Sequence, residues 1–249
     1  MSNPVIIKND PYVSPFVGFD YTKYEFDIRA FWEYFAGKEP SNTFDDVHPI
    51  FEKIIAQYRP QIIYEIGTYK GKSALHMANL TKKYQIPNAR VVCIDTWLGS
   101  AEHGHSEQDL KKVHGYPTIY YQFLANVMYT NNQDVIVPIP QDSISYYRVL
   151  KENQTYADLI FVDGGHFYES VSNDIRLYWE VLKPGGIMLG DDYCPKAWPD
   201  VVRAVHEFFP EDQIHVEDGK WWYRNQYNQH KHNQSLSLGD EKVTSCCKH

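Results

Sequence analysis

The chain has 249 residues, of which 43% are hydrophobic and 15% aromatic, and its formal net charge is -8 at pH 7. This length and composition argue against disorder and suit one α/β domain with a proper core and a short N-terminal extension. The acidic balance argues against a nucleic-acid groove, because phosphate binding depends on Lys and Arg, and it favours a small-molecule substrate.

Features that would direct the chain to a membrane or an oxidising compartment are lacking. No stretch approaches the roughly 18 continuous apolar residues of a membrane span. Asn3, Lys8 and Asp10 interrupt the N-terminus where a signal peptide needs an apolar core. Two of the four cysteines lie in or beside apparent strands and two in the polar tail, which is no disulfide framework. We therefore expect a cytoplasmic protein without a membrane partner.

The sequence predicts three regions. Residues 1–58 form an N-terminal arm and a helical cap, residues 59–225 a single α/β domain, and residues 226–249 a polar tail that we expect to be disordered. In the cap, apolar side chains recur at helical spacing over residues 24–35 and again over residues 43–60. The arm can cover its own site or that of a neighbouring subunit, so a homo-oligomer stays open.

Strands and helices alternate through the domain. Strands are predicted at residues 62–66, 91–94, 135–139, 159–162 and 187–189, and helices at residues 71–83, 144–150 and 168–182, with a long helical region after the second strand. A helix from Pro199 to Phe209 and two strands joined at Asp218-Gly219 follow. We therefore predict an α/β fold with a doubly wound, mostly parallel seven-stranded sheet and an antiparallel edge hairpin.

A glycine-rich turn joins the first strand to the next helix. Gly67 and Gly71 enclose three residues, whereas a Walker A loop needs four, and Tyr69 stands where a dinucleotide fingerprint has glycine. Both nucleotide hydrolysis and dinucleotide binding are therefore disfavoured. Glu65 precedes this turn, and Asp95 ends the second strand, where a carboxylate can accept both hydroxyls of a ribose. The pattern indicates an adenosine-containing ligand without a pyrophosphate.

Carboxylates follow two later strands. Asp163 comes directly after residues 159–162 and is followed by two glycines and His166, and Asp191-Asp192 follow the strand at 187–189. Three carboxylates at neighbouring strand ends suit Mg²⁺ or another divalent cation, which prefers oxygen ligands. A solvated loop or a helix cap is the alternative for Asp191-Asp192.

Together these motifs resemble the class I S-adenosylmethionine-dependent methyltransferases over roughly residues 60–224. The glycine loop with Tyr69 and the carboxylates is similar to catechol O-methyltransferases. The Asp163-Gly-Gly-His166 box and Asp95-Thr-Trp97 are similar to TylF-type macrolide sugar O-methyltransferases and cephalosporin hydroxylase-like proteins. The resemblance implies a Rossmann-like methyltransferase fold for residues 59–225.

The resemblance also implies roles for individual residues. Residues that would bind S-adenosyl-L-methionine are Glu65, Gly67, Thr68, Tyr69, Gly71, Ser73, Asp95, Asp142, Ser143 and Asp163. The implied Mg²⁺ ligands are Asp163, Asp191 and Asp192, and the implied catalytic base is His166. The histidines at 103, 105 and 114 are open to a zinc site, but their segment is more naturally a lid over the substrate.

The sequence therefore predicts a metal-dependent O-methyltransferase. Its acceptor would be a hydroxyl of a small molecule, such as a sugar, a polyol or a catechol-like natural product. Two alternatives stay open: an enzyme of the same fold with different transfer or hydroxylase-like chemistry, and a non-catalytic S-adenosylmethionine-binding module. Titration with several cofactors separates the first, and cofactor binding without turnover identifies the second.

Overall fold

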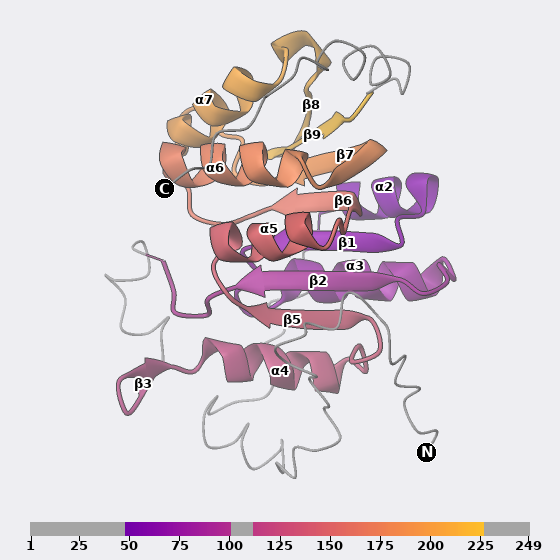
Figure 1. Ribbon diagram of the computed structural model, residues 1–249, viewed down its shortest axis with the longest axis vertical. Helices are drawn as coiled ribbons and strands as arrows, with labels where there is room; N and C mark the ends of the chain where they lie inside the picture. The colour runs from indigo at the N-terminus through magenta and orange to yellow at the C-terminus, as the bar shows by residue number, and fades with distance from the viewer. Residues whose placement is uncertain (1–47, 101–111, 227–249) are drawn as a thin grey trace, which may run out of the picture.

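The computed structural model describes residues 48–100 and 112–226 (Figure 1). The expected arm, the helix predicted at residues 24–35, His103, His105 and the tail after residue 226 lie outside the described residues. Within those two ranges, no helix is both long and apolar enough to cross a membrane.

A seven-stranded sheet forms the centre of the domain (Figure 1). Its strands are β1 (Ile62–Ile66), β2 (Arg90–Asp95), β5 (Ile136–Pro140), β6 (Ala157–Val162), β7 (Leu182–Gly190), β8 (His215–Glu217) and β9 (Lys220–Arg224). The order across the sheet is β5-β2-β1-β6-β7-β9-β8; the first five strands run parallel, and β9 and β8 are antiparallel. The predicted fold class, including the antiparallel edge hairpin, is confirmed.

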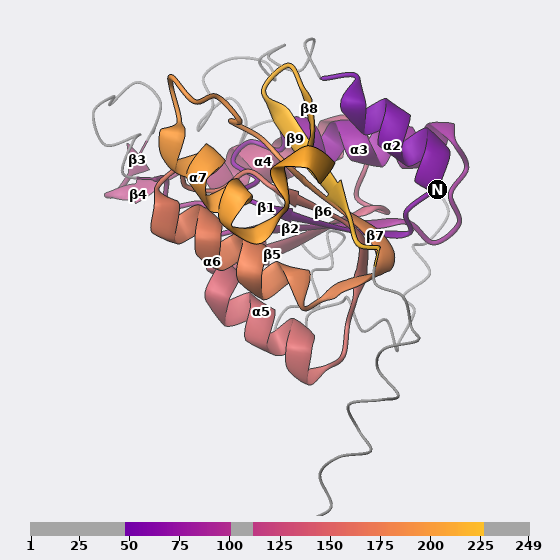
Figure 2. The same ribbon diagram turned by 90° about the horizontal axis from the view of Figure 1, so that it is seen from above.

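Helices cover both faces of the sheet (Figure 2). The helices are α2 (Ile50–Tyr58), α3 (Lys72–Lys83), α4 (Ile119–Tyr129), α5 (Ser143–Glu152), α6 (Tyr168–Trp179) and α7 (Pro199–Phe208). The apolar faces of α2, α3 and α4 form one core with the sheet, and those of α5, α6 and α7 form the other. Because β1 is buried on both faces, its run of apolar residues does not alternate with polar ones.

Two predicted boundaries were wrong. The helix predicted at 168–182 ends at Trp179, and Leu182 begins β7 by pairing with Ala157. The helical region predicted after β2 contains the hairpin of β3 (Lys112–Val113) and β4 (Tyr116–Pro117), joined by His114-Gly115. Both turn residues have positive φ, 50° and 86°, as a tight two-residue hairpin requires.

The parallel strands all end at one edge of the sheet. From β1 the chain moves outward through β2 to β5, and then returns to β6 on the other side of β1. At such a reversal the loops on either side separate and leave a crevice, which is where open α/β sheets bind ligands. The turns that follow β1, β2, β5, β6 and β7 therefore surround the candidate site.

Candidate functional site

The glycine turn after β1 lies directly against the end of β6. Gly67 has a φ of +84°, and a Cβ there would lie 2.1 Å from the carbonyl oxygen of Asp163. Gly71 begins α3 with a φ of +88°, and its missing side chain leaves room for the ring of Phe123. Glycine is required at both positions, so the backbone turn passes close to the end of β6.

Glu65 is buried beneath this turn, at the end of β1. Its carboxylate accepts hydrogen bonds from Thr68 Oγ1 at 2.8 Å and from Ser73 Oγ, which stands in the first turn of α3. Burial raises the pKa of Glu65 to about 7, against 4.5 for an ordinary glutamate. The turn is therefore fixed to the sheet by a carboxyl that titrates near neutral pH.

Asp95 fixes the same turn from β2. One carboxylate oxygen accepts from the backbone amides of Thr68 at 2.9 Å and Tyr69 at 2.7 Å, and the other from the amide of Trp97 at 2.7 Å. Trp97 Nε1 in turn donates to the carbonyl of Tyr69 at 2.7 Å. The residue predicted to hold a ribose is thus also the anchor of the glycine turn.

The predicted residues after β5 stand at the start of α5. The carboxylate of Asp142 caps the helix by accepting from the amide of Ser145 at 2.9 Å. Hydrogen bonding with the Ser145 side chain, and then with this amide, lowers the pKa of Asp142. Ser143 Oγ donates at 2.6 Å to Asp174, a buried carboxyl of α6 whose pKa burial raises to about 6. Asp174 was missed in the sequence, because nothing local marks a helical aspartate as facing a cavity.

These turns enclose a cavity of about 820 Å³. Its lining contains nine of the residues predicted to act here, namely Gly67, Thr68, Tyr69, Ser73, Asp95, Asp142, Ser143, Asp163 and His166. Asp174, which was not predicted, lines it as well. Volumes of 300–1,000 Å³ are usual for small-molecule sites. The structure therefore brings the predicted cofactor residues after β1, β2, β5 and β6 together around one space.

The candidate base and two candidate metal ligands lie beside this cavity. His166 Nε2 lies 2.7 Å from Asp192 Oδ2, and the imidazole packs on the ring of Trp198 with centroids 4.2 Å apart. Ligand atoms of Asp163, His166 and Asp192 all lie within 4.8 Å of one another. Burial, together with the negative charge of Asp191, raises the pKa of Asp163 well above its ordinary value.

The third predicted metal ligand faces another partner. Asp191 Oδ2 accepts from Nζ of Lys220, at the start of β9, rather than facing His166 and Asp192. Asp191 and Lys220 line a second cavity of about 490 Å³, which shares Asp163 with the first. Two carboxylates and an imidazole at this spacing fit a divalent cation, and Asp191 is one residue away on the same turn.

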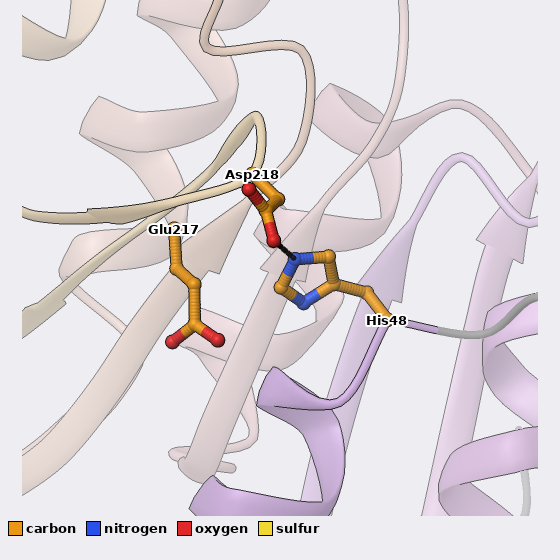
Figure 3. A group of neighbouring side chains, drawn as sticks. All are labelled: His48, Glu217 and Asp218. Carbon is orange, nitrogen blue, oxygen red and sulfur yellow. Dashed lines mark ion pairs between the residues drawn. The ribbon is translucent and has the colours of Figure 1, made fainter.

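His48, Glu217 and Asp218 form a further group of potential ligands, and His48 and Asp218 also line the second cavity (Figure 3). The amide of Ile50 donates to His48 Nδ1 at 3.1 Å, so a neutral ring carries its proton on Nε2. That nitrogen lies 3.9 Å from Asp218 Oδ2. A protonated Nε2 cannot ligate a metal, and Glu217 already pairs with Lys53. The group is therefore a contact between the residue two before α2 and the β8–β9 turn.

Comparison with known proteins identifies the family to which this domain belongs. Residues 64–193 match a family model described as a methyltransferase domain. The chain belongs to this methyltransferase family. The matched segment of the methyltransferase domain contains every predicted site residue from Glu65 to Asp192, whereas Lys220 lies beyond it. The predicted membership of the class I S-adenosylmethionine-dependent methyltransferases is confirmed.

Individual relatives of this methyltransferase domain are distant. Uncharacterized protein R132 of Acanthamoeba polyphaga mimivirus is 27% identical over 150 residues, which cover 60% of this chain and 59% of that protein. Catechol O-methyltransferase of Mus musculus is 25% identical over 181 residues, which cover 72% and 60%. The chain thus spans about three-fifths of the length of the curated relatives it matches.

Solved structures share the fold at lower identity. The calicheamicin methyltransferase CalS11 is 18% identical with a TM-score of 0.52, covering 71% of this chain and 76% of that one. An O-methyltransferase from Bacillus cereus, in complex with SAH, is 16% identical with a TM-score of 0.53, covering 87% and 96%. These likenesses confirm the Rossmann-like methyltransferase fold, and the roles of individual residues stay predictions.

Proposed function

We propose that this methyltransferase domain transfers the methyl group of S-adenosylmethionine to a hydroxyl of a small molecule, with the help of a divalent cation. The observation that carries the proposal is that Asp163, Ser73 and Lys72 line both cavities. Methyl transfer requires the donor and the acceptor oxygen to meet in line, so two adjoining cavities with a shared wall suit it. The acceptor, a sugar, a polyol or a catechol-like natural product, would lie where the two cavities meet at Asp163, next to His166 on the wall of the larger cavity.

The larger cavity fits the methyl donor, which would supply the transferred group. A glycine turn, with Gly67 at positive φ, lets a ligand approach the backbone closely. Glu65, Ser73 and the amides at the start of α3 would hold its amino-acid end, and Asp95 its ribose. The adenine would lie between Asp142 and Ser143 at the start of α5.

His166 is the candidate general base. Asp192 holds the imidazole at 2.7 Å, and Trp198 packs against its face, so the orientation of the ring is fixed. A carboxylate beside an imidazole also stabilises the imidazolium that forms when the base accepts a proton. His166 would therefore take the hydroxyl proton as the oxygen attacks the methyl carbon.

Asp163, Asp191 and Asp192 are the candidate ligands for a divalent cation. Such a cation would increase the acidity of a coordinated hydroxyl. Two of these carboxylates lie together with His166, and the third is one residue away. The rings of Phe51 and Phe161 line the smaller cavity together with Asp163 and Asp191 and would exclude water from the acceptor.

Binding and turnover of the full chain test this proposal. Isothermal titration should show binding of both S-adenosylmethionine and S-adenosylhomocysteine. A panel of sugars, polyols and catechols, each with Mg²⁺ or Mn²⁺, should then produce S-adenosylhomocysteine with a hydroxyl acceptor and not with its deoxy analogue. If neither sulfur compound binds, the proposal fails. Binding without turnover on any member of the panel supports the non-catalytic binding module instead.

A further inference from the structure

Lys220 places a positive charge beside the candidate metal site. It opens β9 directly after the Asp218-Gly219 turn, and its Nζ donates to Asp191 Oδ2. The ammonium also lies 5.7 Å from the ring centroid of Phe51 and 5.6 Å from that of Phe161. Its side chain is only 12% exposed. The charge is therefore held mainly by one carboxylate and two aromatic rings.

A part-buried ammonium depends on its anionic partner. In the described part of the chain, Asp191 is the carboxylate within ion-pair distance of Lys220. A dication bound to Asp191 would remove the partner of Lys220 and place like charges within a few ångströms. Metal binding and the Lys220–Asp191 pair therefore compete for one carboxylate.

We propose that Lys220 sets the metal affinity of this site, because its ammonium neutralises Asp191 and must release it before that carboxylate binds a divalent cation. This inference rests on the proposed function, in which Asp163, Asp191 and Asp192 are metal ligands. It goes further, because it assigns the strength of metal binding to a residue of the edge hairpin. The hairpin lies outside the segment that matches the family model.

A purely structural role makes a different prediction. If Lys220 only attaches the β8–β9 hairpin to the sheet, its replacement changes stability and leaves metal affinity unchanged or weaker. If it competes with the cation, removal of its charge strengthens metal binding while arginine, which keeps the charge, does not. The aliphatic stem packs on two rings, so methionine is the closest uncharged replacement.

The experiment is a titration of the full chain with Mn²⁺ in the absence of S-adenosylmethionine and S-adenosylhomocysteine. The electron paramagnetic resonance signal of free Mn²⁺ measures binding. Lys220→Met should bind Mn²⁺ about tenfold more tightly than wild type or better, as removal of a like charge at this range implies. Lys220→Arg should match wild type. Lys220→Met/Asp191→Asn should lose the gain. Lys53→Met is the matched control. It removes an exposed ammonium that pairs with Glu217 of the same hairpin, and it should leave Mn²⁺ affinity unchanged.

The outcomes distinguish failure of this inference from failure of the proposed function on which it rests. Binding of S-adenosylhomocysteine to each variant reports on its fold, and Lys220→Gln replaces the methionine variant if that one does not fold. Wild-type Mn²⁺ binding that Asp163→Asn abolishes, with no gain in Lys220→Met, overturns the inference and leaves the proposed metal site standing. If no variant binds Mn²⁺ although all bind S-adenosylhomocysteine, the metal part of the proposed function and the inference both fall.

Discussion

Replacement of Glu65 by Gln tests the electrostatics of the cofactor site. The carboxyl is buried and accepts hydrogen bonds from Thr68 and Ser73, and burial raises its pKa to about 7. Glutamine has the same shape and does not titrate. The hydroxyls of Thr68 and Ser73 can rotate to donate to or accept from the glutamine amide. The main change is therefore the loss of a buried charge above neutral pH.

The size of the effect follows from the two pKa values. The folded protein holds the Glu65 proton up to about pH 7, whereas the unfolded chain releases it near 4.5. Because the folded-state pKa is raised, the unfolded chain binds fewer protons between these values, and the free energy of unfolding falls as pH rises. Linkage gives a loss of about 2.5 kcal/mol between pH 5 and pH 8 from this group.

Urea unfolding at the two pH values measures this loss. The free energy of unfolding of Glu65→Gln minus that of wild type should grow by about 2.5 kcal/mol from pH 5 to pH 8. Glu52→Gln is the control, because the pKa of that exposed carboxyl is lowered by Lys83 and Tyr84. A difference for Glu65→Gln that is equal at both pH values would show that the folded protein ionises Glu65 below pH 5, and would refute the reasoning.

Three other predictions concern the cavities. Asp95→Ala removes the acceptor of three backbone amides and should weaken S-adenosylhomocysteine binding by about 1–3 kcal/mol in a titration; an unchanged dissociation constant would contradict the role of Asp95. His166→Ala should lower kcat by roughly 10²- to 10⁴-fold while cofactor affinity stays the same, and near-full kcat at saturating acceptor would remove it as the base. Excess EDTA should abolish turnover and spare cofactor binding, so equal rates with EDTA and with Mg²⁺ would make the metal assignment wrong.

The sequence was sufficient for the parallel sheet and for a set of candidate cofactor residues that the structure brings to one cavity. Strands β1, β2 and β6 consist mainly of apolar residues and end at or just before a glycine or a carboxylate, so the local pattern predicts both the strand and the candidate residues at its end. The edge hairpin was predicted from another local signal, the turn dipeptide Asp218-Gly219. The His114-Gly115 hairpin was missed because its strands have two residues each, too few for any periodicity.

The remaining site residues depend on contacts between distant parts of the chain. Lys220 is a lysine at the start of a short strand, and only the folded sheet brings it to Asp191, 29 residues earlier. Asp174 occupies a helix position like any other until α6 packs beside α5 and brings it to Ser143. Sequence reasoning identifies side chains that follow strands, but it does not identify partners supplied by packing.

The contact between Gly67 and the end of β6 limits how this protein can diversify. Because a Cβ at Gly67 would meet the backbone of Asp163 at 2.1 Å, the glycine turn after β1 and the turn after β6 cannot be altered separately. Part of the wall of the smaller cavity comes from the start of α2 and the residues just before it, and from the β8–β9 hairpin, and both lie outside the matched segment 64–193. Under the proposed function, a change of acceptor is therefore best sought by replacing those two elements with their counterparts from a homologue while residues 64–193 are left unchanged.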